Sequence, residues 1–256
     1  MVFETGIMIV QLIAHRGIPQ QYPENSIKGL EAALQAGACF VETDVQLTSD
    51  GVPVLCHDQD LMRMTGSSVE IAAIDYHTVK NMEAGYPERF GGQYRHFRVA
   101  SLTEFCNTLR QWPDRIAFIE IKRASLSIFG HDPVLEVILQ TISPIITQCV
   151  LISFDHKVIE NFRERTGRPI GWVLPEWSAV SLERLEVLAP EYAFCNRKRL
   201  PAESISPPRG IWKWVIYTVN DPADVHDFTN RGFSMVETDT IDTMLSAPGL
   251  ADSRCG

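Results

Sequence analysis

Eight short apolar segments that recur between stretches of helical pattern are the feature that most constrains how this chain of 256 residues can fold. They are rich in Val, Ile and Phe and are predicted to be strands, at residues 7–14, 39–45, 116–122, 149–154, 169–174, 192–196, 214–219 and 232–238. Strands that alternate with helices pair in parallel, because each crossover helix returns the chain to the same end of the sheet. Eight such units match the ~250 residues of a typical (β/α)8 barrel, so we predict a TIM barrel.

Capping residues mark where several helices begin. Asn25 is expected to cap the first helix, Ser101 and Glu104 form a capping box before a later one, and Asp221 opens another. A doubly wound open sheet is the alternative fold. However, no GxGxxG motif follows the first strand, which ends instead in the sequence AHRG. The barrel is therefore the favoured architecture.

Two segments interrupt the regular alternation. Asp50-Gly51 lies between alternating segments after the second strand, which predicts a β-hairpin whose returning strand runs antiparallel and stands outside the eight. If the hairpin folds symmetrically about Asp50-Gly51, it brings His57 beside Asp44. Residues 59–100 then lack a clear helix–strand rhythm, which is typical of a lid or small subdomain. We expect one domain over 1–256, with 59–100 as its insertion.

The charge and hydropathy of the chain exclude several classes of partner. The 23 Lys and Arg residues against 32 Asp and Glu give a formal charge of −9, which argues against general nucleic-acid binding and against docking on anionic membranes. No apolar run reaches the ~18 residues of a membrane helix, so we expect no membrane insertion. The N-terminal MVFETGIMIVQLIA lacks a basic region and is expected to be a strand rather than a signal peptide. A homo-oligomer is left open.

The six cysteines are predicted to be reduced residues of the core. None lies in a CxxC pair, and most are inside apolar runs: Cys39, Cys56, Cys106, Cys149, Cys195 and Cys255. Because disulfides are rare in reducing compartments, this expectation goes with a cytoplasmic location.

Polar side chains gather where the predicted strands end, which is where TIM barrels carry their active sites. Glu42 and Asp44 are two residues apart in the second strand, as are Glu120 and Lys122 in the third, so each pair shares one face. Glu42, Asp44 and Glu120 are then expected to converge. Clustered carboxylates repel one another unless a cation joins them, and an all-oxygen ligand set selects Mg²⁺ or Ca²⁺. The alternative is a set of separate salt bridges to Lys122 and Arg16.

Two histidines complete the predicted site. His15 ends the first strand, and the hairpin carries His57 to the same mouth of the barrel. With a metal and Arg16, two imidazoles suit acid–base chemistry on a phosphoester, because one removes a proton while the other supplies one. Phe154 and Tyr217, at strand ends, are candidates for an apolar wall against the substrate, with core packing as the alternative.

The motifs of the chain resemble those of the glycerophosphodiester phosphodiesterase family. In chain order they are His15-Arg16-Gly17, Pro23-Glu24-Asn25-Ser26, Glu42-x-Asp44, Asp50-Gly51, His57-Asp58, Glu120-x-Lys122, Ser153-Phe154, Thr218-Val219-Asn220 and Thr238-Asp239. They run from residue 15 to residue 239, so the resemblance covers nearly the whole chain. The sequence differs at Tyr217, where the family usually has Trp, and after Thr238-Asp239, where the usual Tyr-Pro is absent. Both differences bear on the wall that faces the alcohol headgroup.

The resemblance implies a (β/α)8 barrel that uses one divalent cation to hydrolyse glycerophosphodiesters, such as glycerophosphocholine or glycerophosphoethanolamine, to glycerol 3-phosphate and an alcohol. It implies that the metal ligands are Glu42, Asp44 and Glu120. It also implies that His15 and His57 are the acid and base and that Arg16 and Lys122 contact the phosphate. The alternatives are a lysophospholipase D-like enzyme acting on lysolipids, a metal-dependent barrel lyase or aldolase, and a barrel that binds phosphodiesters without turnover.

Overall fold

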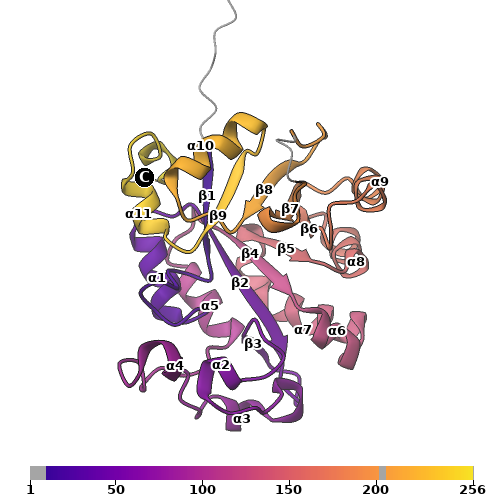
Figure 1. Ribbon diagram of the computed structural model, residues 1–256. Helices are drawn as coiled ribbons and strands as arrows, with labels where there is room; N and C mark the ends of the chain where they lie inside the picture. Colours follow the sequence, from indigo (N-terminus) through magenta and orange to yellow (C-terminus); the bar gives the residue numbers. More distant parts are fainter. Residues whose placement is uncertain (1–9, 202–205, 256) are drawn as a thin grey trace, which may run out of the picture.

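Eight parallel strands close on themselves in the computed structural model, which describes residues 10–201 and 206–255 (Figure 1). The barrel strands are β1 (Gln11–His15), β2 (Phe40–Leu47), β4 (Ile116–Ile121), β5 (Cys149–Ser153), β6 (Ile170–Val173), β7 (Tyr192–Asn196), β8 (Lys213–Tyr217) and β9 (Met235–Thr238). Strand β1 pairs in parallel with both β9 and β2, which closes the barrel. The predicted TIM barrel is confirmed. Each predicted strand overlaps an observed one, and residues 7–9 of the first lie outside the described residues.

Helices surround the barrel and cover its outer face (Figure 1). They are α1 (Ile27–Gln35), α5 (Leu102–Leu109), α6 (Arg123–Phe129), α7 (His131–Ile142), α8 (His156–Thr166), α9 (Ala179–Leu188), α10 (Pro222–Arg231) and α11 (Ile241–Ser246), with short 3-10 turns η2 (Ser143–Gln148), η3 (Arg197–Arg199) and η4 (Ala251–Ser253). Among residues 10–201 and 206–255, no helix is both long and apolar enough to span a membrane.

Alternation along the strands divides the core into two layers. In β1, Leu12 and Ala14 belong to the layer between strands and helices, whereas Ile13 belongs to a second cluster in the barrel interior. Phe118 and Met235 fill this interior cluster and are fully buried. The barrel is therefore packed beneath its mouth, as in other TIM barrels, and polar side chains can gather above this floor.

The start of α1 differs from the prediction. Ser26 is the N-cap, with its Oγ accepting from the backbone N of Gly29 at 3.1 Å, so the assignment of Asn25 was wrong. Asn25 instead has a φ of 59° and uses its side-chain amide between Asp44 and Thr43, at 2.9 and 2.8 Å. Its amide therefore supports strand β2 near the mouth. The predicted capping box at the start of α5 is present.

The hairpin is present, but its register is one residue from the prediction. Strand β3 (Pro53–Leu55) runs antiparallel to β2 with Val45 opposite Leu55, and the backbone N of Cys56 donates to the carbonyl of Asp44. The turn is centred on Asp50 rather than on the Asp50-Gly51 bond, because the loop has an extra residue and Gly51 takes a left-handed φ of 79°. His57 follows one residue after the position opposite Asp44.

Residues that follow β3 form a small group of short helices beside the barrel, at the lower end of Figure 1. These are α2 (Met62–Thr65), the 3-10 turn η1 (Ile71–Ala73), α3 (Tyr76–Val79) and α4 (Pro87–Phe90). Their buried side chains, among them Leu61, Met64 and Val79, pack in a cluster separate from both barrel layers. Residues 59–100, which include these helices, are called the insertion below.

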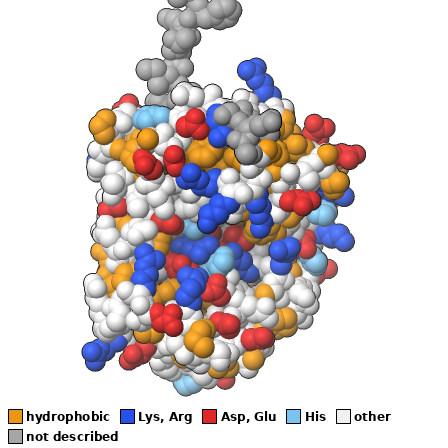
Figure 2. Space-filling model, in the orientation of Figure 1, with side chains coloured by type: hydrophobic (Ala, Val, Ile, Leu, Met, Phe, Trp, Pro, Cys, Tyr) orange, Lys and Arg blue, Asp and Glu red, His pale blue; other side chains and the backbone are white. Residues whose placement is uncertain are grey.

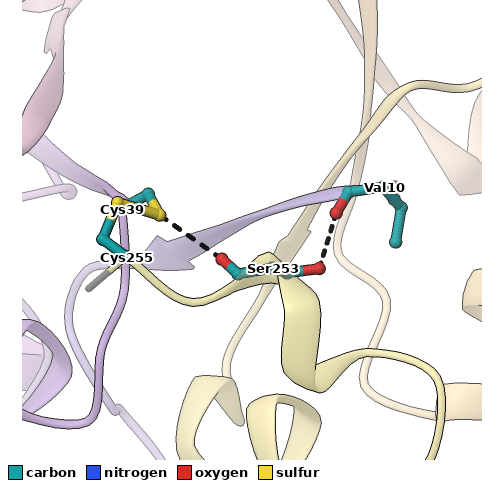
Figure 3. The surroundings of a disulfide bond; sticks show 4 residues. All are labelled: Val10, Cys39, Ser253 and Cys255. Carbon is teal, nitrogen blue, oxygen red and sulfur yellow. Dashed lines mark hydrogen bonds between the residues drawn. A yellow bond between two sulfur atoms is a disulfide. The ribbon is translucent and has the colours of Figure 1, made fainter. Parts of the chain in front are cut away.

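The prediction of six reduced cysteines was wrong for two of them. Cys39 and Cys255 form a disulfide with their Cα atoms 5.1 Å apart (Figure 3). Ser253 lies beside it, and its Oγ donates to the carbonyl of Val10 at 2.6 Å. The pair is separated by 216 positions, so only the closure of the barrel brings the two sulfurs together. The other four cysteines are free and buried.

Alkylation of the denatured protein, purified without reductant, tests this disulfide. We expect four of the six cysteines to react before reduction and all six afterwards. In Cys39→Ser, which releases Cys255, all five remaining cysteines should react, and the free energy of unfolding should fall by about 2–4 kcal/mol. Reaction of six cysteines in the unreduced wild type would show that the pair is not bonded.

Candidate active site

A cavity of about 310 Å³ opens at the carboxyl ends of the barrel strands. Figure 2 shows basic, acidic and histidine side chains gathered near the centre of one face of the molecule. The charged or titratable groups that line the cavity are His15, Arg16, Glu42, His57, Glu120, Lys122, Arg199 and Glu237. The rest of the lining is mainly apolar and includes both predicted wall residues, Phe154 and Tyr217. Every site residue predicted from the sequence lines this cavity except Asp44, which is fully buried.

Strand register brings the three predicted carboxylates together. Asp44 in β2 is paired with Glu120 in the neighbouring β4, and Glu42 lies two residues before Asp44 on the same face. Three carboxylate oxygens, one from each side chain, lie within 4.8 Å of one another, and all three residues are buried. The arrangement is that of a ligand set for a single cation.

Two basic side chains partly neutralise this cluster. Nζ of Lys122 lies 2.6 Å from Asp44 Oδ1 and 2.9 Å from Glu120 Oε1, and Nε of Arg16 lies 2.9 Å from Asp44 Oδ2. Burial opposes ionisation of Asp44, but Arg16 and Lys122 outweigh it and hold the pKa of this carboxyl well below its usual range. Salt bridges and a carboxylate cluster, treated above as alternatives, are therefore both present.

Glu42 is left without such support. Its residue is 2% exposed, and neither carboxylate oxygen has a hydrogen-bond partner among the described residues. Burial, and next to it the Asp44 carboxylate, raise the pKa of Glu42 well above its ordinary value. A buried carboxylate without donors is costly, and a hard cation bound to oxygen ligands would remove that cost. Glu42, Asp44 and Glu120 therefore fit a divalent cation.

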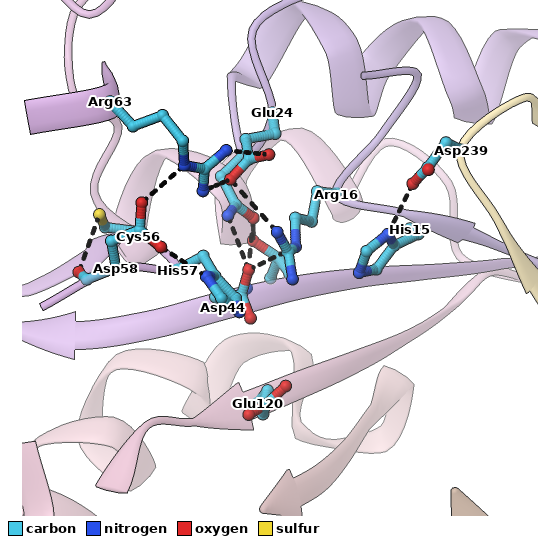
Figure 4. A network of polar contacts seen from close by, with 12 residues as sticks. His15, Arg16, Glu24, Asp44, Cys56, His57, Asp58, Arg63, Glu120 and Asp239 are labelled. Atoms are coloured by element: carbon cyan, nitrogen blue, oxygen red, sulfur yellow. Dashed lines mark hydrogen bonds and ion pairs between the residues drawn. The ribbon is translucent and has the colours of Figure 1, made fainter. Parts of the chain in front are cut away.

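Each of the two histidines has one ring nitrogen held by a carboxylate (Figure 4). Nδ1 of His15 donates to Asp239 at 2.7 Å, and Nδ1 of His57 donates to Asp58 at 2.7 Å. Because a carboxylate can only accept, each bond places the proton on Nδ1 and leaves Nε2 as the basic nitrogen. Burial lowers the pKa of His57 below its ordinary value, which favours the neutral ring.

The insertion contributes a residue that the sequence did not reveal. Arg63 of α2 binds both carboxylate oxygens of Glu24, at 2.9 and 2.6 Å, and its Nε donates to Asp58 at 2.7 Å (Figure 4). Glu24 also lies 3.3 Å from Arg16, and Asp58 holds His57. One arginine thus links the insertion to the residues that contact Arg16 and His57. No local pattern signals this role, because its two partners come from different loops.

Glu237 also lines the cavity and is absent from the predicted site. It lies in β9 two residues after Met235 and points into the barrel, where burial raises its pKa to about 7. The signal was present in the sequence, since Glu237 shares the inward face with Met235 by period 2. The motif Thr238-Asp239, which carries the family resemblance at this strand end, begins one residue after Glu237.

The barrel and its mouth together define a TIM-barrel enzyme with an acidic site suited to a divalent metal. Residues 15–243 match the model of the glycerophosphoryl diester phosphodiesterase family. The chain belongs to this family of hydrolases.

Curated relatives match over part of their length. The chain is 32% identical over 126 residues to glycerophosphodiester phosphodiesterase 1 of Mus musculus, covering 48% of this chain and 34% of that protein. It is 34% identical over 111 residues to glycerophosphodiester phosphodiesterase of Caldanaerobacter subterraneus, covering 43% of this chain and 44% of that one. The matched stretches thus span less than half of either relative.

Solved structures share the fold over nearly the whole chain. A phosphodiesterase of Oleispira antarctica, in complex with the product sn-glycerol-3-phosphate, has a TM-score of 0.80 at 24% identity, over 93% of this chain and 96% of that one. Glycerophosphodiester phosphodiesterase of Agrobacterium tumefaciens has a TM-score of 0.72 at 17% identity, over 93% of this chain and 100% of that one.

Replacing Arg63 by Met should destabilise the protein. The change leaves Glu24, which is 8% exposed, without its bidentate partner, so we expect the free energy of unfolding to fall by about 1–3 kcal/mol in urea denaturation. Arg98→Met is the matched control, because Arg98 is an exposed residue of the insertion whose hydrogen bonds go to backbone carbonyls, and its effect should stay within about 0.5 kcal/mol. Equal effects of the two variants would contradict the linking role of Arg63.

Proposed function

We propose that this chain hydrolyses glycerophosphodiesters, such as glycerophosphocholine or glycerophosphoethanolamine, to glycerol 3-phosphate and an alcohol. The observation that carries the proposal is the pair of histidines, each held at Nδ1 by a carboxylate, beside three buried carboxylates in one cavity. Membership of the family supports it, as does the sn-glycerol-3-phosphate bound to the Oleispira antarctica phosphodiesterase of the same fold.

We assign one divalent cation, Mg²⁺ or Ca²⁺, to Glu42, Asp44 and Glu120. Bound there, the cation would supply positive charge that offsets the negative charge of the phosphodiester and stabilises the negative charge that develops around phosphorus in the transition state. Arg16 and Lys122 line the same cavity and would contact the phosphate oxygens through their positive charges. In this structure both are paired with Asp44. Phe154 and Tyr217 would form the apolar wall against the glycerol or headgroup.

The two histidines would act as base and acid in two steps. Nε2 of one ring removes the proton from the neighbouring glycerol hydroxyl, which attacks phosphorus, while the other ring protonates the leaving alcohol. Water then opens the cyclic phosphate with the two roles exchanged, which returns both rings to their starting states. Asp239 and Asp58 orient His15 and His57 throughout, since each fixes the proton on Nδ1.

We propose that 1–256 is one domain and that residues 59–100 act as a lid, supported by the contact of Arg63 with Glu24 and of the Tyr94 hydroxyl with the carbonyl of Gln21. A cytoplasmic location was expected from reduced cysteines, and the bond between Cys39 and Cys255 weakens that basis.

Release of glycerol 3-phosphate from glycerophosphocholine tests the function. Chelator-stripped protein should be inactive, and added Mg²⁺ or Ca²⁺ should restore release. His15→Asn and His57→Asn should each lower kcat by ~10²–10⁴. His77→Asn, which changes an exposed histidine of the insertion, should leave kcat unchanged. Metal-independent release, or near-normal turnover in both site variants, would overturn the assignment.

A further inference from the structure

Glu42 belongs to two sets of converging ligand atoms. One set is the carboxylate cluster with Asp44 and Glu120. The other consists of His15, Glu42 and Glu237, whose ligand atoms also lie within 4.8 Å of one another. The three residues come from neighbouring strands, since β1 lies between β2 and β9 and His15 is paired with Glu42 in the β1–β2 register.

Three of the four carboxylate oxygens in this second set are buried and accept no hydrogen bond from a described residue. Both oxygens of Glu42 and Oε1 of Glu237 lack a hydrogen-bond partner among the described residues, and the two residues are 2% and 4% exposed. The neighbouring cations Arg16 and Lys122 are paired with Asp44, at 2.9 and 2.6 Å. Arg16 acts on Glu42 and Glu237 through its charge but donates no hydrogen bond to these oxygens, and a cation bound directly to them would stabilise the buried carboxylates further.

The histidine of the set is already oriented as a metal ligand. Nδ1 of His15 donates to Asp239, which in turn accepts from Asn220 at 3.0 Å, so the lone pair of Nε2 is free. Nε2 lies 4.0 Å from Glu42 Oε2, too far for a hydrogen bond. Two ligands of a tetrahedral zinc ion lie ~3.3 Å apart, so the two side chains would move together by about 0.7 Å to bind one ion. Metal-binding histidines commonly donate their other nitrogen to a carboxylate in this way.

We propose that His15, Glu42 and Glu237 form a second cation site, which shares Glu42 with the first and takes a transition metal such as Zn²⁺. One imidazole nitrogen with two carboxylates suits Zn²⁺, whereas the all-oxygen set suits Mg²⁺ or Ca²⁺. The consequence of this second site for activity rests on the proposed function. The second ion binds Nε2 of His15, which is the nitrogen assigned to proton transfer. Zn²⁺ at this site therefore inhibits the hydrolysis that the first cation supports.

Calorimetric titration of Zn²⁺ into Mg²⁺-saturated protein tests the site without substrate. The wild type should bind one Zn²⁺ more per chain than Glu237→Gln, or bind it at least tenfold more tightly. Asp239→Asn, which removes the carboxylate that orients His15, should weaken binding 10–100-fold. Glu186→Gln, on the exposed side of α9, is the matched control and should bind as the wild type does. Circular dichroism and retained Mg²⁺ binding would show that the variants are folded.

Activity then tests the consequence. At fixed Mg²⁺, Zn²⁺ should inhibit the wild type and inhibit Glu237→Gln at least tenfold less strongly. Equal Zn²⁺ binding by the wild type and Glu237→Gln, or none by either, would overturn the second site, whether or not the protein hydrolyses glycerophosphodiesters. Zn²⁺ binding that is lost in Glu237→Gln but does not inhibit would support the site and contradict the role assigned to His15.

Discussion

Mutual repulsion among buried carboxylates is the constraint around which the mouth of this barrel is built. Glu42, Asp44 and Glu120 are all buried within one small volume, and Glu237 is buried beside them. Like charges at such distances in a poorly solvated site cost free energy unless cations or protons offset them. The structure offsets them unevenly, because Asp44 has close ion pairs with Arg16 and Lys122 whereas Glu42 accepts no hydrogen bond from any described residue.

That unevenness gives the site its chemical character. Asp44 stays ionised because Arg16 and Lys122 stabilise its charge, whereas burial favours the protonated forms of Glu42 and Glu237 when no metal is bound. Carboxylates that repel one another stay close together only where the surrounding structure fixes their positions. Here the scaffold is the closed strand register above a packed interior, and the insertion braces it through the Arg63–Glu24 pair.

Much of this arrangement follows from local sequence patterns. Apolar runs rich in Val, Ile and Phe predicted the strands, and the two-residue spacing of Glu42 and Asp44 predicted a shared face, because both depend on residues close in the chain. The hairpin register was missed by one residue, since a left-handed Gly51 allows a longer loop than the sequence pattern alone specifies. Ser26 and Asn25 are adjacent and both are good caps, and the contacts of Asn25 with strand β2 decided between them.

Features that depend on distant segments were not predictable in this way. The disulfide joins residues 216 positions apart, and Arg63 takes partners from two other loops. Neither carries a local signal, because only closure of the barrel and docking of the insertion bring the groups together. Glu237 is different: its inward direction could be predicted, but its closeness to His15 and Glu42 depends on β9 pairing beside β1.

Mg²⁺ binding to metal-free protein, measured calorimetrically in buffers of different ionisation enthalpy, tests the central claim most directly. Burial raises the pKa of Glu42 well above its ordinary value, which favours the protonated carboxyl in the metal-free protein, whereas a bound cation requires the carboxylate form. We expect that Mg²⁺ binding releases protons, that affinity rises with pH, and that Glu42→Gln weakens binding and reduces the release. Binding without proton release, and with equal affinity in Glu42→Gln, would contradict it.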